Sequence, residues 1–310
     1  MEYDVVIVGA GPAGMTAGVF AARKGLKALI VGKDLGGQVS WTTDIENYMG
    51  FAEIDGQTLM ERFQAQVKEH NLDEKLVGIR TLQKTGEGFH LETDTGEQLT
   101  AKTVIICSGK KPRTLDVPGE VEFRNRGVSY CSTCDAPLFR DAEVAVVGGG
   151  NSAVKAVLDL ANYAKAVHLI YRRNELTADA VLMQRLEKLD KLTLHPGHTV
   201  VEIAGNKAVE RLKLEEVATK KQKDLPVQGI FIEIGLIPNT EFVDSAVTRN
   251  DANEIQIDCH CQTNIPGLYA AGDVSSVPEK QIIIAAGEGA KAAIKVWEYL
   301  METPEFAVKH

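Results

Sequence analysis

The sequence lacks the features that mark membrane, secreted and nucleic-acid-binding proteins. Its most apolar run near the C-terminus, residues 282–286, is far shorter than the roughly 20 apolar residues that cross a bilayer. Residues 1–4 are acidic rather than basic, unlike the start of a signal peptide. The net charge is −9 with acids and bases interspersed, whereas a phosphate-binding surface needs a basic patch. We therefore expect a cytoplasmic protein that binds neither membrane nor nucleic acid.

Cysteine is scarce, and the five in this chain do not form a secreted disulfide framework. Cys131 and Cys134 have the spacing at which two thiols close a small disulfide ring and one thiolate commonly has a lowered pKa. A zinc site would need a second pair of ligands, and residues 259–261 stand in a context typical of a strand and turn. A redox pair is thus favoured over half a zinc site or a structural disulfide. The other cysteines are interpreted as structural: Cys107, Cys259 and Cys261.

Glycine, in contrast, is abundant, with 28 residues, and it forms a phosphate-binding pattern near the N-terminus. An apolar strand from Tyr3 leads into Gly9-x-Gly11-x-x-Gly14, and a helix is predicted over residues 15–24. The first glycine permits a tight turn, and the second lets the backbone approach a pyrophosphate. The third lets the helix pack closely on the strand, and the N–H groups of the helix start face the anion.

The same pattern occurs a second time in the middle of the chain. A strand from Ala142 leads into Gly148-x-Gly150-x-x-Ala153, where alanine takes the third place, and a helix is predicted over residues 153–163. One such motif is weak evidence, but two copies with a strand before and a helix after each indicate two dinucleotide sites on one chain.

Two proline-containing passages, residues 111–119 and 237–240, suit crossings between domains. A β-rich stretch over residues 75–103 lies before the first passage, and a final helix over residues 282–301 follows the second. We predict an α/β protein with two Rossmann-like, three-layer ββα dinucleotide-binding domains, the second inserted in the first. The predicted boundaries are 1–115, 116–240 and 241–310.

Further short motifs accompany the two glycine patterns. They are Gly36-Gly37-Gln38, Asp44-Ile45-Glu46-Asn47-Tyr48, Cys131-Ser132-Thr133-Cys134-Asp135, Gly235-Leu236-Ile237-Pro238-Asn239-Thr240, Ala271-Gly272-Asp273-Val274, Lys280-Gln281 and Ala286-Gly287-Glu288-Gly289. Over essentially the whole chain, the sequence resembles the low-molecular-weight thioredoxin reductases. It is equally similar to the reductase portion of the alkyl hydroperoxide reductase flavoprotein, most of all in residues 229–240 and the tail. We do not expect the N-terminal thioredoxin-like domains of that branch, because the first strand begins at Tyr3.

The resemblance implies FAD on the first glycine motif, within residues 1–115 and 241–310. Asp34, twenty residues after Gly14, stands where a ribose-contacting acid is expected. The family places Asp273 on the ribityl chain, and Gln281 with the following helix start at the isoalloxazine, where the helix N-terminus stabilises negative charge. The implied FAD residues are Gly9, Gly11, Pro12, Ala13, Gly14, Gly32, Lys33, Asp34, Gly36, Gly37, Gln38, Asn47, Gly109, Gly272, Asp273, Lys280, Gln281 and Ile282.

The second motif is expected to bind the electron donor. Arg173 stands twenty residues past Ala153, where NAD-preferring sites carry an acid, and positive charge there accommodates the 2′-phosphate of NADP. NADPH-dependent relatives typically carry a third arginine where this chain has Thr177, and glutamate where it has Lys155. NADPH is the first choice of donor, NADH the second and a ferredoxin-type protein the third. The implied NADPH residues are Gly148, Gly150, Asn151, Ser152, Ala153, Arg172 and Arg173.

The resemblance also implies roles for the redox motif. Cys134 is the flavin-side sulfur, Cys131 attacks the disulfide of a partner through a mixed disulfide, and Asp135 is the general acid, a role that would require burial near the flavin to raise its pKa. Relatives usually have glycine where this chain has Ala136, and alanine restricts the backbone if that position requires a positive φ. Rotation of the inserted domain about linkers near Val117 and Asn239 would present nicotinamide and disulfide to the flavin in turn.

The activity implied is that of an FAD-dependent thioredoxin-disulfide reductase, with thioredoxin or a glutaredoxin-like protein as substrate and a homodimer as the assembly. Reduction of a peroxiredoxin-type partner is the second enzymatic interpretation. A ferredoxin–NADP reductase is disfavoured by the cysteine pair, and an oxygen-dependent disulfide-forming oxidase by the intact second glycine motif. A flavin-binding sensor without turnover is a further alternative.

Overall fold

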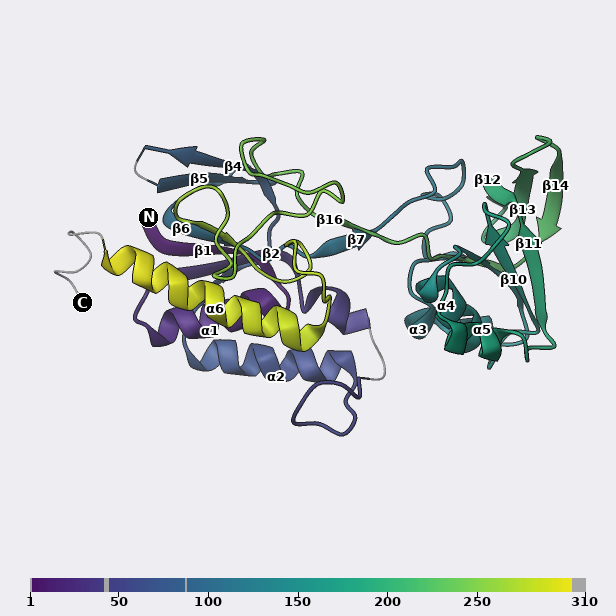
Figure 1. The fold of residues 1–310 in the computed structure, drawn as a ribbon, viewed down its shortest axis with the longest axis horizontal. Helices are drawn as coiled ribbons and strands as arrows, with labels where there is room; N and C mark the ends of the chain where they lie inside the picture. Colours follow the sequence, from purple (N-terminus) through teal and green to yellow (C-terminus); the bar gives the residue numbers. More distant parts are fainter. Residues whose placement is uncertain (1, 42–44, 87, 303–310) are drawn as a thin grey trace. The chain divides into compact units, whose positions relative to one another are not determined.

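The structure, a computed structural model, describes residues 2–41, 45–86 and 88–302. Asp44, part of one predicted motif, lies outside the described residues, as does the side chain of Cys134, whose backbone is described. The chain divides into two compact units, Met1–Lys111 with Ile237–His310, and Pro112–Leu236. The second unit is thus inserted in the first (teal to green in Figure 1).

The chain crosses between the units twice, at two short strands that pair with each other. These strands are β7 (Lys110–Pro112) and β16 (Leu236–Pro238). Residues 117–119, predicted as part of the first crossing, lie inside the second unit, where the Pro118 carbonyl accepts the N–H of Ile203 at 2.9 Å.

The first unit is built on a largely parallel sheet in the order β3-β2-β1-β6, extended by β17 on the far side of β6. Long runs of valine and isoleucine are buried on both faces of these strands, as expected for a parallel sheet covered on both sides. Two antiparallel strands, β5 and β4, continue from the first half of β6. The strands are β1 (Glu2–Ala10), β2 (Ala28–Leu35), β3 (Asp73–Lys75), β4 (Ile79–Thr85), β5 (Gly88–Thr93), β6 (Gln98–Ile106) and β17 (Leu268–Ala270).

Alternate residues of β1 supply the two faces of the first core. Val5 and Ile7 pack towards α1 (Pro12–Arg23) and α6 (Ile282–Met301), while Val6 and Val8 pack with β4, β5 and the segment after residue 240. The helices α1, α6 and α2 (Gly56–Glu69) lie on the same side of the sheet (Figure 1). Helix α6 has the predicted bounds, whereas α1 begins at Pro12 rather than Met15, because proline fits the first helical position, where no N–H is needed.

The second unit repeats this plan with a fully parallel sheet in the order β11-β10-β9-β15-β8. Helices α4 (Asn151–Leu160) and α5 (Ala180–Leu186) cover one face, and the antiparallel sheet β12-β13-β14 covers the other. The strands are β8 (Val128–Ser129), β9 (Glu143–Val147), β10 (Ala166–Tyr171), β11 (Leu192–Pro196), β12 (His198–Gly205), β13 (Val209–Glu216), β14 (Gln222–Pro226) and β15 (Gly229–Ile232).

Each unit is therefore a three-layer ββα arrangement around a parallel sheet, and the predicted fold class is confirmed. Within the described ranges, no helix is long and apolar enough to cross a membrane.

Candidate functional site

The first glycine turn joins β1 to α1 in a conformation that only glycine fits. Gly9 has φ +117°, and a Cβ there would lie 2.2 Å from the Cys107 carbonyl oxygen. A Cβ on Gly14 would lie 1.8 Å from the Gly9 carbonyl oxygen, so the helix packs directly on the turn. Gly11 precedes α1 without a side-chain cap, which leaves the first N–H groups of the helix without a side-chain acceptor. Such a helix start favours an anion.

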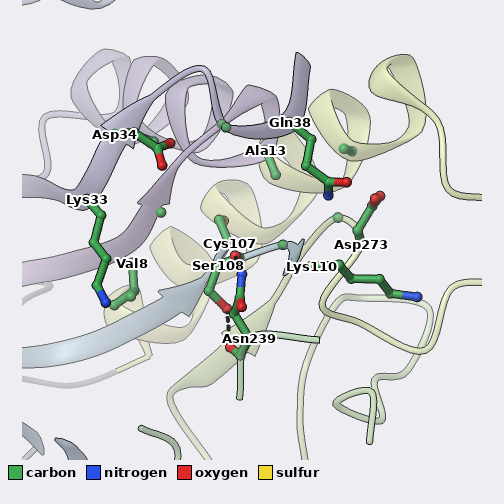
Figure 2. A pocket seen from close by; sticks show the side chains of 18 of the residues that line it. Val8, Ala13, Lys33, Asp34, Gln38, Cys107, Ser108, Lys110, Asn239 and Asp273 are labelled. Atoms are coloured by element: carbon green, nitrogen blue, oxygen red, sulfur yellow. Dashed lines mark hydrogen bonds between the residues drawn. The ribbon is translucent and has the colours of Figure 1, made fainter. Parts of the chain in front are cut away.

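This turn opens onto a cavity of about 750 Å³ formed entirely within the first unit (Figure 2). Lys33 and Asp34 lie on one side of it, and Lys110 and Asp273 on the other (Figure 2). The volume suits a large organic cofactor. The predicted flavin residues that line it are Gly9, Gly11, Pro12, Ala13, Gly32, Lys33, Asp34, Gly36, Gly37, Gln38, Gly109, Gly272, Asp273, Lys280, Gln281 and Ile282.

Two predicted flavin residues do not line the cavity but support residues that do. Gly14 packs beneath Gly9. Asn47 donates its side-chain N–H to Oε1 of Gln281 at 3.0 Å, which links the residue before α6 to the segment around residue 47. The residues that line the cavity fit an extended dinucleotide. The helix start and glycine turn suit the diphosphate, and the exposed Asp34 at the end of β2 suits the ribose hydroxyls as an acceptor.

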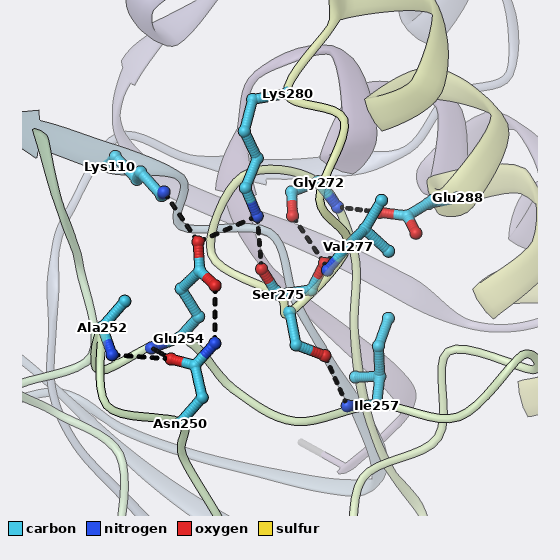
Figure 3. A network of polar contacts seen from close by, with 11 residues as sticks. Lys110, Asn250, Ala252, Glu254, Ile257, Gly272, Ser275, Val277, Lys280 and Glu288 are labelled. Atoms are coloured by element: carbon cyan, nitrogen blue, oxygen red, sulfur yellow. Dashed lines mark hydrogen bonds and ion pairs between the residues drawn. The ribbon is translucent and has the colours of Figure 1, made fainter. Parts of the chain in front are cut away.

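Two lysines of the cavity wall are fixed by one acid that sequence reasoning missed (Figure 3). Glu254 accepts hydrogen bonds from Nζ of Lys110 at 2.8 Å and from the side chain of Asn250 at 2.7 Å, and it pairs with Lys280 at 3.1 Å. Burial raises the pKa of Glu254, but the donors Lys110, Asn250 and Lys280 outweigh it and lower the pKa to about 2. Glu254 therefore stays ionised and holds the ammonium groups of both lysines.

A second acid orients the turn that carries Asp273. Glu288, buried in α6, accepts the N–H of Gly272 at 2.8 Å and the hydroxyl of Ser275 at 3.5 Å (Figure 3). Burial raises the pKa of Glu288, and burial also raises the pKa of Asp273, against the lowering effect of Lys280 and Lys110. The one sequence signal for Glu288 is a charge among the small residues of α6.

The second glycine turn, in the other unit, repeats the chemistry of the first. Gly148 has φ +150°, and a Cβ there would lie 2.2 Å from the Glu233 carbonyl oxygen. Ala153 is fully buried beneath the turn. Gly150 precedes α4 without a side-chain cap, and Ser152 is exposed on the first turn of that helix. The arrangement again offers free helix N–H groups to a phosphate.

The loop after β10 closes over this second turn. Thr177, found where NADPH-dependent relatives have arginine, donates its backbone N–H at 2.7 Å and its hydroxyl at 3.2 Å to the Gly149 carbonyl. Asn151 exchanges two hydrogen bonds with Asp179, at 2.8 and 2.9 Å. Thr177 thus stabilises the loop without adding charge.

The two arginines predicted to select the donor are exposed. Arg172 and Arg173 follow β10 directly, and Lys155 is exposed on α4. The two arginines are free to approach a ligand phosphate from the carboxyl end of the sheet, where open α/β sheets bind ligands.

The redox motif forms a short helix, α3 (Ser132–Asp135), after β8. Cys131 is disulfide-bonded, its N–H donates to the hydroxyl of Ser129 at 3.1 Å, and its carbonyl accepts the N–H of Asp135 at 3.2 Å. Asp135 is partly buried. Ala136 begins the 3₁₀ helix η2 (Ala136–Phe139) and is not at a positive φ, so alanine fits here without strain.

The other three cysteines are free thiols in different surroundings. Cys107 and Cys261 are buried, and Cys259 is exposed. Burial raises the pKa of Cys107, and it raises the pKa of Cys261 to about 12, so both remain protonated. Across residues 2–41, 45–86 and 88–302, no group of three His, Cys, Asp or Glu side chains could hold a metal ion.

Comparisons with known proteins agree with the predicted resemblance. The thioredoxin reductase of Lactococcus lactis is 36% identical, with a TM-score of 0.86 over 97% of this chain and 100% of that one. The alkyl hydroperoxide reductase (F subunit) of Escherichia coli (strain K12) is 40% identical over 97% of this chain, and an NADH dehydrogenase of Bacillus subtilis (strain 168) is 41% identical over 96%. The chain spans 59% of the length of each of these last two relatives.

The family model for pyridine nucleotide-disulphide oxidoreductases matches residues 3–292, which includes both glycine turns, the redox motif and most of α6. The chain therefore belongs to the pyridine nucleotide-disulphide oxidoreductase family.

Proposed function

We propose that this protein is an FAD-dependent disulfide reductase that takes electrons from a nicotinamide nucleotide and reduces a disulfide in thioredoxin or a glutaredoxin-like protein. In this proposal the FAD-binding domain, predicted as residues 1–115 and 241–310, is the first unit. The domain predicted as residues 116–240, which carries the nucleotide site and the redox pair, is the second unit. The observation that supports this most directly is the cavity of the first unit, which all but two of the predicted flavin residues line.

FAD, when bound, supplies two-electron chemistry between nicotinamide and disulfide. The free N–H groups of α1 bind its diphosphate, and Asp34 accepts from the ribose. Asp273, oriented through Gly272 by Glu288, binds the ribityl hydroxyls. Gln281 precedes α6 without a side-chain cap, so the N–H groups and positive potential of this helix start would be available to stabilise negative charge on the ring.

In the second unit, Cys131 attacks the partner disulfide, Cys134 resolves the mixed disulfide, and Asp135 donates a proton to the departing thiolate. Two electrons pass to the partner as its disulfide becomes a dithiol, and the Cys131–Cys134 dithiol becomes a disulfide. Ser129 contributes by anchoring the backbone of Cys131 on both sides, since its hydroxyl accepts the N–H and donates to the carbonyl at 3.2 Å.

NADPH is the proposed donor because Arg172 and Arg173 are exposed beside the second glycine turn. NADH is the second donor, supported by uncharged Thr177 and by the similarity to a relative named NADH dehydrogenase. The test is an anaerobic titration of the purified, yellow protein, in which NADPH bleaches the flavin absorbance at lower concentration than NADH. A reversed order would make NADH the donor, and bleaching by neither would favour a ferredoxin-type protein.

Reduction of a peroxiredoxin is the second candidate function, supported by the similarity to the alkyl hydroperoxide reductases of Staphylococcus aureus and Escherichia coli. The chemistry at Cys131 and Cys134 is the same, and the partner differs. Turnover with thioredoxin, a glutaredoxin-like protein and a peroxiredoxin, each at equal concentration, separates the two functions by kcat/KM. Sedimentation of the holoenzyme tests the proposed homodimer.

A further inference from the structure

Glu233 is an acid beside the redox motif to which the proposed function gives no role. It directly follows β15 and is partly buried. Its N–H donates to the Val147 carbonyl at 2.8 Å, and its own carbonyl oxygen lies 2.2 Å from where a Cβ on Gly148 would be. The backbone of Glu233 is therefore packed against the second glycine turn.

The side chain of Glu233 contacts the redox motif. Its carboxylate accepts the backbone N–H of Ser132, the residue after Cys131 and the first of α3. The hydroxyl of Ser132 donates to Oδ2 of Asp159, on α4, at 3.3 Å. Both hydrogen-bond donors of Ser132 are thus bound by acids, one directly after β15 and the other on α4.

We propose that Glu233 is a positioning residue for the redox pair: it anchors the backbone of Ser132, and its ionisation controls the thiolate fraction of the adjacent cysteines. The inference rests on the redox role proposed above for Cys131 and Cys134. Glu233 would thus control the thiolate fraction from within the second unit, where the glycine turn and α3 approach the end of β15.

The surroundings of Glu233 make its charge respond to pH near neutrality. Helix α4 contributes the negative charge of Asp159, α3 contributes the N–H of Ser132, and residues 148–150 of the glycine turn carry no side-chain charge. Burial, and then the charge of Asp159, raise the pKa of Glu233 to about 7, against the lowering effect of the Ser132 N–H. Below pH 7 the carboxyl is mostly neutral, and above it mostly anionic.

A carboxylate beside the pair disfavours a second negative charge on sulfur, so ionisation of Glu233 raises the pKa of the neighbouring thiol. The two groups then titrate as a coupled system with macroscopic steps. The thiolate fraction consequently rises less steeply with pH than that of an isolated thiol.

The experiment measures the rate of iodoacetamide alkylation of the reduced holoenzyme between pH 5 and 9 in a Cys259→Ser background, with the modified residue mapped by mass spectrometry. Cys259 is the exposed free thiol, while Cys107 and Cys261 are buried. The background protein should show a broadened profile with a step near pH 7. Glu233→Gln keeps an oxygen for the Ser132 N–H but removes the charge. The alkylation rate of this variant should equal that of the background protein at pH 5.5 and be at least threefold higher at pH 7.5. Its pH profile should show a single titration step.

Two further variants separate charge control from a general structural effect. Asp159→Asn keeps an acceptor for the Ser132 hydroxyl but removes the charge that raises the pKa of Glu233, so its step should move to lower pH. If Glu233→Gln fails to fold, this shift alone decides the question. Glu210→Gln, an exposed acid of the same unit, is the matched control and should leave the profile unchanged.

Superimposed profiles for Glu233→Gln and the background, or a ratio of rates that is the same at every pH, would overturn the inference. Turnover of a protein disulfide by the background protein tests the proposed function separately. If the alkylation profile depends on Glu233 but the protein does not turn over a protein disulfide, the proposed function is wrong and the role of Glu233 stands. If turnover is normal but the profiles are superimposed, the role of Glu233 is wrong and the proposed function stands.

Discussion

The cysteines of this chain differ in accessibility, and this difference allows the redox pair to be tested residue by residue. Cys131, directly before α3, is disulfide-bonded, Cys107 and Cys261 are buried thiols with raised pKa values, and Cys259 is exposed and free. A variant at Cys259 therefore removes a thiol of similar chemistry from a site outside the proposed machinery.

Cys131→Ser should retain reduction of the flavin by the nucleotide but lose reduction of protein disulfides by at least a thousandfold, because serine cannot attack a disulfide sulfur. Cys259→Ser should keep both activities. The measurements are anaerobic flavin bleaching and thioredoxin-coupled turnover. Full protein-disulfide turnover by Cys131→Ser would assign the attacking role to another sulfur.

A histidine in the second unit should make the stability of that unit depend on pH. His195 is buried in β11, and its ring contacts Nδ1 of His168 at 3.2 Å and Nζ of Lys223 at 3.5 Å. Burial first, then the charges of Lys223, His168 and His198, lower the pKa of His195 from 6.5 to about 4. The unfolded chain therefore binds a proton between pH 6.5 and 4 that the folded chain does not.

The stability that His195 contributes is present above pH 6.5 and is lost as the pH falls towards 4. At pH 5 the loss should be about 2 kcal/mol. Hydrogen exchange of residues 144–147 in β9, corrected for the pH dependence of intrinsic exchange, measures it. His195→Asn should lose less stability between pH 7 and 5, while exposed His260→Asn should behave as the wild type. Equal losses in all three proteins would contradict the assignment.

At the scale of elements, the contact between α1 and α6 depends on one glycine. A Cβ on Gly289 would lie 2.0 Å from the Ala13 carbonyl oxygen, so the two helices approach through backbone atoms. Gly287, two residues earlier in α6, is exposed and has nothing within 4 Å of its added Cβ. The two positions form a matched pair within one helix.

Gly289→Ala should destabilise the first unit by about 1–3 kcal/mol, because the helix must move off α1 and disturb Ala13 at the cavity wall. FAD affinity should fall with it. Gly287→Ala should instead stabilise by up to about 1 kcal/mol through helix propensity. Thermal unfolding and flavin retention on gel filtration measure both effects, and a neutral Gly289→Ala would show that the helices tolerate separation.

Features specified by residues close together in sequence could be predicted. The turns at Gly9 and Gly148 were found because glycine spacing, a preceding apolar strand and a following helix all occur within about a dozen residues. The bounds of α6 also follow from a local pattern, since small and apolar residues continue from residue 282 to residue 301.

Features that depend on distant pairing could not be predicted. A second β layer was part of the predicted ββα fold, but its strands in the second unit, β12, β13 and β14, were not located from the sequence, because they carry no local marker of the layer that they cover. The contacts of Glu254 with Lys110 and of Glu233 with Ser132 join residues about 100 or more positions apart, so no local spacing reveals them. Residues 117–119 were expected at a crossing because proline and glycine mark turns, yet the structure uses them inside the second unit.

At the scale of the whole molecule, insertion of one unit in the other gives each proposed cofactor its own core. The FAD cavity lies in Met1–Lys111 with Ile237–His310, and the second glycine turn lies in Pro112–Leu236. Both tryptophans of the chain, Trp41 and Trp297, fall in the first of these units. Tryptophan fluorescence therefore reports on unfolding of the FAD-binding unit alone, while circular dichroism reports on both.

Ligand removal should consequently move one transition at a time. A ligand at 100 times its Kd stabilises the unit that binds it by about 2.7 kcal/mol, so depletion of FAD should lower the fluorescence midpoint and leave a second transition in circular dichroism in place. NADP⁺ added to the FAD-depleted protein should raise the midpoint temperature of the second transition in circular dichroism and leave the midpoint temperature measured by fluorescence unchanged. If either ligand shifted both transitions equally, the units would unfold as one cooperative body, and the assignment of one cofactor to each core would lose this support.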